Sequence, residues 1–260
     1  MSGRLQGKVA FISGAARGQG RAHAVRMAEE GADIIAFDAA GPVPSQGAPA
    51  ASVADLDETV RQVEKLDRRI VAHRADASDL DAVTAVLDQG LTEFGRIDIV
   101  VANAGMEKVN IPFTDVTEED FDLLWRVNTK GPYFVLREAA RRIADNGRIV
   151  TISSNTTTVP QVGVALYGTS KIAMSYLIRV AALELGARGV TVNTVVPGPI
   201  DNAGIFTDPS NDEYKKSLID MTPIGRLGTP QDVAAITSFL ASDDAGLITG
   251  QQIVADGGMH

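Results

Sequence analysis

A tyrosine and a lysine four residues apart are the pair in this sequence best suited to proton transfer. Tyr167 and Lys171 occur in the segment ALYGTSK, and a spacing of four places both side chains on one face of a helix. A phenol has a pKa of about 10, so lowering it to about 7 requires about 4 kcal/mol of preferential stabilisation of the phenolate. A lysine ammonium can contribute, because a nearby positive charge favours the ionised form. Ordinary amphipathic helices carry the same spacing, so the remaining residues must decide between the two interpretations.

A glycine-rich turn near the N-terminus is suited to binding a pyrophosphate. The segment SGAARGQG places Gly14, Gly18 and Gly20 between a strand-like run and a helix-like run. Glycines at such positions let the backbone approach the anion, which faces the N–H groups at the start of the helix. Asp38 lies 18 residues after Gly20, where a carboxylate binds adenosine ribose hydroxyls and repels a 2′-phosphate. Arg17 is a cation in the same turn and would favour the 2′-phosphate of NADP. Asp38, however, stands where the ribose is expected, so NAD is favoured over NADP.

The elements that must position these residues alternate between short apolar runs and longer segments of helical periodicity. The apolar runs are nearly continuous, which is typical of strands covered on both faces. Such alternation predicts βαβ crossovers and an α/β fold with a doubly wound parallel sheet. We expect strands at 8–13, 33–37, 69–74, 97–103, 147–153, 189–196 and 251–255, and helices near 18–30, 53–67, 79–93, 118–143, 165–187 and 230–241.

Several of the expected helices have recognisable start signals. Ser52, Ser78 and Thr117 each stand three residues before an aspartate, as in a capping box, and Thr229 precedes a proline suited to the first helical position. Residues 39–52, AAGPVPSQGAPAAS, are predicted to form an extended surface loop. No interdomain linker or repeat interrupts the pattern, so we expect one domain over residues 1–260.

Composition excludes several classes of function. The chain has no cysteine, so disulfides, thiolate zinc sites and cysteine nucleophiles are excluded. Its three histidines, His23, His73 and His260, are too scattered to suggest a metal site. A net charge of −9 argues against nucleic acid or an anionic membrane as the main partner. No apolar run reaches the ~18 to 20 residues of a membrane span, and the N-terminus enters a strand pattern at once, so a cytoplasmic location is expected.

Further motifs appear in a recognisable order along the chain. The glycine turn has the spacing TGxxxGxG with Ser13 in place of the usual threonine, and it is followed by NAG (103–105), VN (127–128), SS (153–154), YGTSK (167–171) and PG (197–198). This set resembles the short-chain dehydrogenase/reductase family over essentially the whole chain. The resemblance implies a Rossmann-type domain with seven parallel strands and helices on both faces.

The resemblance also implies a reaction and a catalytic set. A hydride moves between a carbinol carbon and the nicotinamide ring, while Tyr167 exchanges a proton with the substrate oxygen as general acid/base. Ser154 hydrogen-bonds that oxygen, and Lys171 both lowers the tyrosine pKa and holds the nicotinamide ribose. Asn128 anchors a water in a proton relay. Ser154 is not expected to be a nucleophile, because that role requires a base such as histidine and no histidine lies nearby in the sequence.

Cofactor contacts carry over from the family residue by residue. Asn202 stands where many relatives have a pyrophosphate-binding threonine, and Gln19 replaces the usual isoleucine. The expected cofactor-binding residues are Gly14, Arg17, Gly18, Gln19, Gly20, Asp38, Asp76, Ala77, Asn103, Ala104, Gly105, Tyr167, Lys171, Pro197, Gly198, Ile200 and Asn202.

The two halves of the chain resemble different branches of the family. The N-terminal half is similar to carveol dehydrogenases and mycofactocin-associated members, which implies tightly held NAD and an external redox carrier if that NAD does not exchange. The C-terminal half is similar to 3-oxoacyl-carrier-protein reductases. The family resemblance also implies an oligomer, commonly a tetramer, so a homotetramer is expected.

The substrate side is expected to be mainly apolar. Residues 199–222 occupy the position of the family's mobile lid, and Ser154 and Tyr167 are expected to contact substrate beside Met106 and Phe206. We expect a hydrophobic, terpenoid-like secondary alcohol or ketone. The alternatives are a 3-oxoacyl thioester or small cyclic ketone and, in another class, a catalytically idle NAD-binding sensor or scaffold. The other residues expected to make the pocket apolar are Val162, Val164, Ile205, Leu218, Ile219 and Met221.

Overall fold

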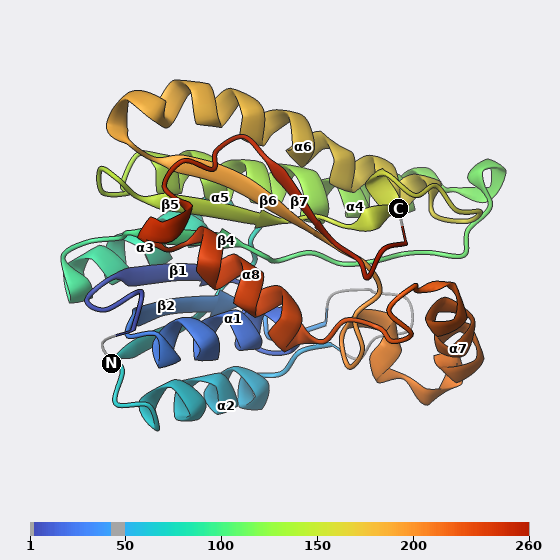
Figure 1. Cartoon of the computed structure of the whole chain (residues 1–260), viewed down its shortest axis with the longest axis horizontal. Coiled ribbons are helices and arrows are strands. Elements are labelled where there is room, and N and C mark those ends of the chain that lie inside the picture. Colours follow the sequence, from blue (N-terminus) through green and yellow to red (C-terminus); the bar gives the residue numbers. More distant parts are fainter. Residues whose placement is uncertain (1–2, 43–49, 260) are drawn as a thin grey trace.

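Seven parallel strands form the sheet at the centre of the molecule (Figure 1). The computed structural model describes residues 3–42 and 50–259. All seven predicted strands are present, in the spatial order β3-β2-β1-β4-β5-β6-β7, so the predicted doubly wound α/β fold is confirmed. The strands are β1 (Val9–Ser13), β2 (Asp33–Asp38), β3 (Ile70–Arg74), β4 (Ile99–Ala102), β5 (Arg148–Ile152), β6 (Thr191–Pro197) and β7 (Gln252–Ala255).

The strand order reverses next to β1, in the middle of the sheet. β2 pairs with one side of β1 and β4 with the other, so that Phe11 lies opposite both Ile35 and Val100. Every residue of β1 is buried, as expected for a strand covered on both faces. Open α/β sheets bind ligands beyond the carboxyl ends of the strands at such a reversal. The ends of β1 and β4 are therefore where a site is expected.

Helices cover both faces of the sheet. One core cluster packs α1, α2 and α8 against it through side chains such as Met27 and Val233. The opposite cluster contains α3, α5 and α6, with Leu87 and Ile178 among its buried residues. No helix in the described ranges is both long and apolar enough to cross a membrane. The helices are α1 (Gly18–Glu29), α2 (Val53–Glu64), α3 (Leu80–Phe94), α4 (Glu118–Trp125), α5 (Gly131–Ala140), α6 (Ala165–Leu185), α7 (Asp212–Met221) and α8 (Pro230–Leu240).

The helix expected over 118–143 is interrupted by a π-helical turn. α4 ends at Trp125, residues Arg126–Lys130 form the π turn, and α5 begins at Gly131. π turns inside helices occur frequently at functional sites. This one contains Asn128, whose side chain is fully buried, so the irregular turn brings the predicted catalytic asparagine toward the interior.

Two of the predicted helix starts are complete capping boxes. Ser52 and Thr229 each accept the N–H of the aspartate three residues on, which in turn accepts the N–H of the cap. Thr117 accepts the N–H of Asp120. The expectation for Ser78 is wrong, because α3 is capped by Asp79, which accepts two N–H groups of the first turn.

Two irregular segments were expected from the sequence, and only one of them lies entirely within the described residues. Residues 43–49 of the predicted loop 39–52 lie outside the described residues. The predicted lid, 199–222, contains two short 3-10 turns followed by α7, a helix that the sequence analysis did not predict. α7 lies beyond the carboxyl edge of the sheet (Figure 1).

His23 is buried in α1, within the layer that α1 forms with α8. The side chain is fully buried, and neither ring nitrogen has a hydrogen-bond partner among the described residues. Burial disfavours the charged imidazolium and lowers the pKa of His23 from 6.5 to about 3. The folded state therefore resists a protonation that the unfolded chain accepts.

Replacing His23 with leucine is expected to make stability less sensitive to mild acid. Because the folded pKa lies below the unfolded value, the free energy of unfolding of the wild type falls as pH drops below about 6.5, by about 2 kcal/mol at pH ~5. Denaturant unfolding at pH ~7.5 and pH ~5 should show this extra loss in the wild type and not in His23→Leu. The half-buried His73 serves as control, and His73→Leu should change the pH dependence less. Equal acid sensitivity in wild type and His23→Leu would contradict the assignment.

Candidate active site

A cavity of about 400 Å³ opens at the carboxyl ends of the strands and extends to the lid. It brings together nearly all of the residues predicted for the cofactor, the substrate and catalysis. Asn128 lies behind its wall, fully buried. Asn202 is exposed outside it, with a backbone φ of 55°. The predicted residues that line the cavity are Gly14, Arg17, Gly18, Gln19, Gly20, Asp38, Asp76, Ala77, Asn103, Ala104, Gly105, Met106, Ser154, Tyr167, Lys171, Pro197, Gly198, Ile200 and Phe206.

The glycine turn is shaped by close backbone packing between the end of β1 and the start of α1. Gly14 has a φ of 68°, which favours glycine. A Cβ atom added at Gly20 would overlap the carbonyl oxygen of Gly14. The amide of Asn103 supports the turn from β4, because its Nδ2 donates to the carbonyl oxygens of Ser13 and Gly14, both at 3.1 Å.

Ser13 joins the ends of β1 and β4. Its hydroxyl oxygen accepts the N–H groups of Asn103 and Ala104, each at 3.0 Å, and donates to the Val101 carbonyl at 3.5 Å. The family threonine that Ser13 replaces has the same hydroxyl, so the substitution keeps this link. The hydroxyl thus accepts two backbone N–H groups just after β4, and the Asn103 N–H also donates to the Val101 carbonyl at 3.1 Å.

Asp38 is held in a defined orientation at the end of β2. Its Oδ2 accepts the N–H of Ala16 at 3.0 Å, and its Oδ1 accepts the N–H of Ala40 at 2.9 Å. The carboxylate therefore faces the glycine turn across the adenosine end of the cavity. Each oxygen keeps a second lone pair for a ribose hydroxyl.

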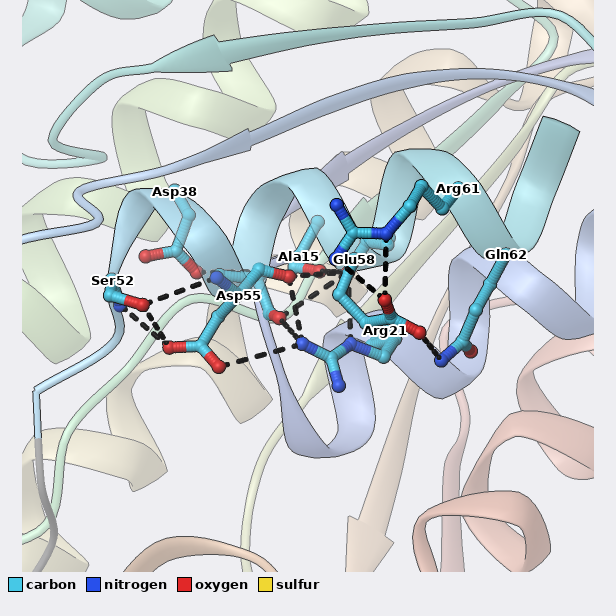
Figure 2. Close-up of polar contacts among 10 residues, drawn as sticks. Ala15, Arg21, Asp38, Ser52, Asp55, Glu58, Arg61 and Gln62 are labelled. Atoms are coloured by element: carbon cyan, nitrogen blue, oxygen red, sulfur yellow. Dashed lines mark hydrogen bonds and ion pairs between the residues drawn. The ribbon is translucent and has the colours of Figure 1, made fainter.

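Two residues that the sequence analysis missed tie the glycine turn to α2 (Figure 2). Arg21 donates to the carbonyl oxygens of Ala16 at 2.5 Å and Asp55 at 2.7 Å, and to the hydroxyl of Thr59 at 3.0 Å. Thr59, fully buried, donates to the Ala15 carbonyl at 2.9 Å. The available signal was a threonine on the buried face of α2, but its partner lies 38 residues away.

Replacing Thr59 with valine should weaken binding of the dinucleotide that the sequence motifs predict for the glycine turn, because Thr59 supports that turn from α2. The change keeps the side-chain shape but removes one hydrogen bond to the turn and leaves the Nε of Arg21 unpaired, a loss of about 1 to 2 kcal/mol. Part of that loss should appear as a three- to tenfold increase in the dissociation constant for NAD, measured by calorimetry. Thr84→Val is the control, because that hydroxyl bonds only a carbonyl within α3. An unchanged NAD affinity in Thr59→Val would contradict a positioning role.

Ser154 and Tyr167 face one another across the cavity from the end of β5 and the first turn of α6. The Ser154 oxygen accepts the N–H of Thr156 at 3.3 Å and its hydroxyl at 3.1 Å. Ser154 then has its own proton to donate to the Tyr167 oxygen, a bond that favours the phenolate. The serine is thus oriented by two donors toward the tyrosine.

Lys171 lies one turn beyond Tyr167 on α6, as the spacing predicted. Its Nζ donates to the Ile152 carbonyl at 3.3 Å and lies 5.9 Å from the centre of the Tyr167 ring. Burial lowers the pKa of Lys171 to about 8, and the Glu107 carboxyl acts in the opposite direction. The ammonium is therefore still the main form at neutral pH, with protons left for further acceptors.

The expected lowering of the Tyr167 pKa is not produced by these protein groups. Burial raises the pKa of Tyr167 and the Glu107 carboxyl raises it further, while the hydrogen bond from Ser154 lowers it. Desolvation disfavours an anion, and at its distance the Lys171 ammonium does not outweigh it. The protein alone therefore keeps the phenol protonated at neutral pH.

Asn128 connects the loop after β4 with α6. Its Oδ1 accepts the N–H of Met106 at 2.9 Å, and its Nδ2 donates to the Met106 carbonyl at 2.8 Å and the Ser170 hydroxyl at 3.0 Å. Both amide protons are thus used within the protein. The side chain holds the loop that carries Met106 against the helix that carries Tyr167 and Lys171.

The substrate end of the cavity is largely apolar, as expected. Met106, Val164, Ile205, Phe206 and Leu218 all line it. Three side chains expected there do not. Val162 is 94% exposed and Met221 is 59% exposed, and Ile219 lies outside the lining. Glu107 and Tyr214 are among the polar residues that line the cavity but were not predicted from the sequence.

The donor and acceptor set fits a nicotinamide dinucleotide. The glycine turn provides open backbone for a pyrophosphate, and Asp38 provides acceptors for the adenosine ribose. Gln19 adds a buried Oε1 with no partner among the described residues. Lys171 has spare protons for a second ribose. Such a combination defines a nucleotide-binding oxidoreductase of Rossmann type.

Comparison with known proteins identifies the family. The family model described as enoyl-(acyl carrier protein) reductase matches residues 14–260. Versicolorin reductase stcU of Emericella nidulans is 38% identical over 269 residues, covering 98% of this chain and 96% of that protein. The chain belongs to the short-chain dehydrogenase/reductase family, and it is therefore an oxidoreductase that uses a nicotinamide cofactor.

Solved structures agree over the whole chain. Carveol dehydrogenase from Mycobacterium avium in complex with NAD has a TM-score of 0.95 at 32% identity, with 99% of each chain covered. A short chain dehydrogenase from Mycobacterium paratuberculosis bound to NAD has a TM-score of 0.89 at 41% identity, again with 99% of each chain covered. Other similar structures contain NADP or NADPH. The similarity to carveol dehydrogenase thus extends beyond the N-terminal half in which the sequence suggested it.

Proposed function

We propose that this protein transfers a hydride between a hydrophobic secondary alcohol or ketone and NAD, with Tyr167 as general acid/base. One observation carries the proposal. Ser154, Tyr167 and Lys171 line the same cavity as the glycine turn and Asp38, so the proton-transfer groups and the nucleotide-binding groups share one space. A catalytically idle sensor would need the nucleotide-binding groups but not the proton-transfer groups.

The chain's own residues supply proton transfer and orientation. Ser154 and Tyr167 together hold the substrate oxygen, and Tyr167 takes or gives its proton. The Lys171 ammonium fixes a ribose hydroxyl and contributes positive charge next to the phenol. When bound, the oxidised nicotinamide accepts the hydride and adds a further positive charge. Asn128 keeps the loop of Met106 and the helix of Tyr167 at a constant separation.

Asp38 is the basis for preferring NAD to NADP. Its carboxylate is fixed toward the glycine turn by two backbone N–H groups, and a 2′-phosphate placed there would meet a negative charge. Arg17 and Arg74 are the nearby cations, but Arg74 donates to the Ala39 carbonyl at 3.1 Å. Two similar mycobacterial structures contain NAD, which supports the same choice.

The apolar lining supports a hydrophobic substrate. A terpenoid-like secondary alcohol agrees with the similarity to carveol dehydrogenase. A cyclic ketone on an aromatic skeleton is the second candidate, supported by the similarity to versicolorin reductase. A 3-oxoacyl thioester remains the alternative suggested by the C-terminal half of the sequence.

Exposed apolar side chains on α6 support an oligomer. Tyr176 is 74% exposed and Leu183 is 85% exposed, and Ile172 lies on the same helix. Large apolar side chains gathered on one helix commonly mark a subunit interface. We therefore propose a homotetramer, the assembly that the family resemblance implies.

The protein as purified is expected to retain NAD through extensive dialysis. Tight retention follows from the carveol dehydrogenase-like arrangement of the nucleotide end, and it would require an external redox carrier for turnover. The test is heat denaturation followed by chromatographic quantification of NAD(H) and NADP(H) in the supernatant. Near-stoichiometric NAD supports the proposal. Recovery of NADP would contradict the role given to Asp38, and an empty supernatant would contradict tight retention.

Tyr167→Phe is expected to reduce kcat about 10²- to 10⁴-fold, because it removes the group that exchanges the substrate proton. NAD affinity should change less than about threefold, since the phenol contributes little to nucleotide binding. Steady-state rates with cyclic secondary alcohols, in the presence of NAD or an artificial electron acceptor, measure the first effect, and calorimetry measures the second. Tyr133→Phe, at a side chain that is 45% exposed on α5, is the control and should retain full activity. A Tyr167→Phe enzyme within tenfold of wild type would overturn the proposed mechanism.

A further inference from the structure

A carboxyl group lies at the substrate end of the cavity, where the remaining lining is mainly apolar. Glu107 follows Met106 at the end of the loop after β4 and lines the cavity together with Ile205, Phe206 and Tyr214. The mechanism described above makes no use of it. Glu107 is half-buried, and a carboxyl group that is partly removed from water loses hydration unless it is paired, so its position calls for an explanation.

The lid holds this carboxyl group in place. Oε1 of Glu107 accepts a short hydrogen bond from the backbone N–H of Ile205. Gly204, with a φ of 55°, lets the lid backbone come this close, because a Cβ atom there would overlap Oε1. The position of Glu107 is therefore fixed by the lid.

The second oxygen of Glu107 is left for a ligand. Oε2 accepts no hydrogen bond from the described residues, and none of their cationic side chains forms an ion pair with Glu107 within 4.0 Å. Burial raises the pKa of the Glu107 carboxyl group. The hydrogen bond from the Ile205 N–H lowers this pKa, and so do the positive charges of Lys171 and Arg17. In turn, the charge of Glu107 raises the pKa of Tyr167. The carboxyl group is therefore within electrostatic reach of the group that would meet the reacting oxygen.

Fastening the lid does not by itself explain an acid at this position. A neutral amide would also accept the Ile205 N–H, and it would carry no charge to desolvate. A carboxyl group with one oxygen anchored and the other facing a cavity is suited to bind a hydroxyl group in a fixed direction. It also repels anionic substrates.

We propose that Glu107 is a specificity-determining residue that hydrogen-bonds a second hydroxyl group of the substrate, close to the reacting carbon. The substrate class is then a hydroxylated secondary alcohol or ketone on an otherwise apolar skeleton, and anionic analogues are excluded. This inference rests on the proposed oxidoreductase function and narrows its substrate.

The test compares kcat/KM of the holoenzyme for cyclohexanol with kcat/KM for cis- and trans-cyclohexane-1,2-diol. The wild type should show a kcat/KM for at least one diol that is about tenfold or more above that for cyclohexanol, since a site built to bind a hydroxyl rejects the analogue that lacks it. Glu107→Leu should bring this ratio close to one. Glu107→Gln, which keeps an acceptor for Ile205, should give an intermediate ratio.

A lid variant distinguishes a direct contact between Glu107 and the substrate from a general effect on lid closure. Asp201 pairs with Lys215 within the lid at 2.5 Å and does not line the cavity. Asp201→Asn should change the rates for cyclohexanol and the diols by the same factor and leave their ratio unchanged. A change of ratio in Asp201→Asn equal to that in Glu107→Leu would overturn a direct contact with substrate.

A binding measurement distinguishes failure of this inference from failure of the proposed function. Trp125 is the only tryptophan of the chain, and it packs in the same cluster as Met106 and Tyr167, so its fluorescence can report ligand binding. The wild-type holoprotein should bind a diol about tenfold more tightly than cyclohexanol, and Glu107→Leu should not. If the holoprotein turns over neither alcohol but still binds the diol more tightly than cyclohexanol, the proposed reaction is wrong and the role of Glu107 stands. Equal affinities, or a preference that survives in Glu107→Leu, would overturn the role of Glu107.

Discussion

The link between the ends of β1 and β4 is the constraint on which the rest of the site depends. The strand order reverses at β1, and the backbone N–H groups that follow β4 need acceptors there. The Ser13 hydroxyl accepts two of them, and the Asn103 amide donates back to the glycine turn. The same few bonds thus set the shape of the glycine turn and the starting point of the loop that leads to Met106 and Glu107.

Other buried polar side chains connect this part of the sheet to the surrounding helices by hydrogen bonds. Asn128 joins the loop after β4 to α6, and Arg21 with Thr59 joins the glycine turn to α2. Each is satisfied almost entirely by backbone groups, which is how a polar side chain can lie in the interior without a large loss of stability. His23 is the contrast, because both of its ring nitrogens are buried without a hydrogen-bond partner among the described residues.

The features predicted from the sequence are those encoded over short distances. Apolar runs located all seven strands, and the motifs at their ends located the residues of the cavity, because parallel strands end at one edge of the sheet. The π turn that contains Asn128 leaves the apolar periodicity almost unchanged, so the sequence suggested one continuous helix. Arg21 and Thr59 meet only after the fold brings α1 and α2 together. Val162 was placed in the pocket on hydrophobicity alone, whereas the loop that carries it points the side chain to solvent.

The charges around Tyr167 indicate how proton and hydride transfer become coupled. Burial and the Glu107 carboxyl hold the phenol in its neutral form, and the same burial weakens the hold of Lys171 on its proton. In such surroundings ionisation of the phenol requires additional positive charge next to it. A bound oxidised nicotinamide would supply such a charge. Under the proposed mechanism, the raised pKa of Tyr167 would restrict proton exchange to the state in which the hydride acceptor is bound.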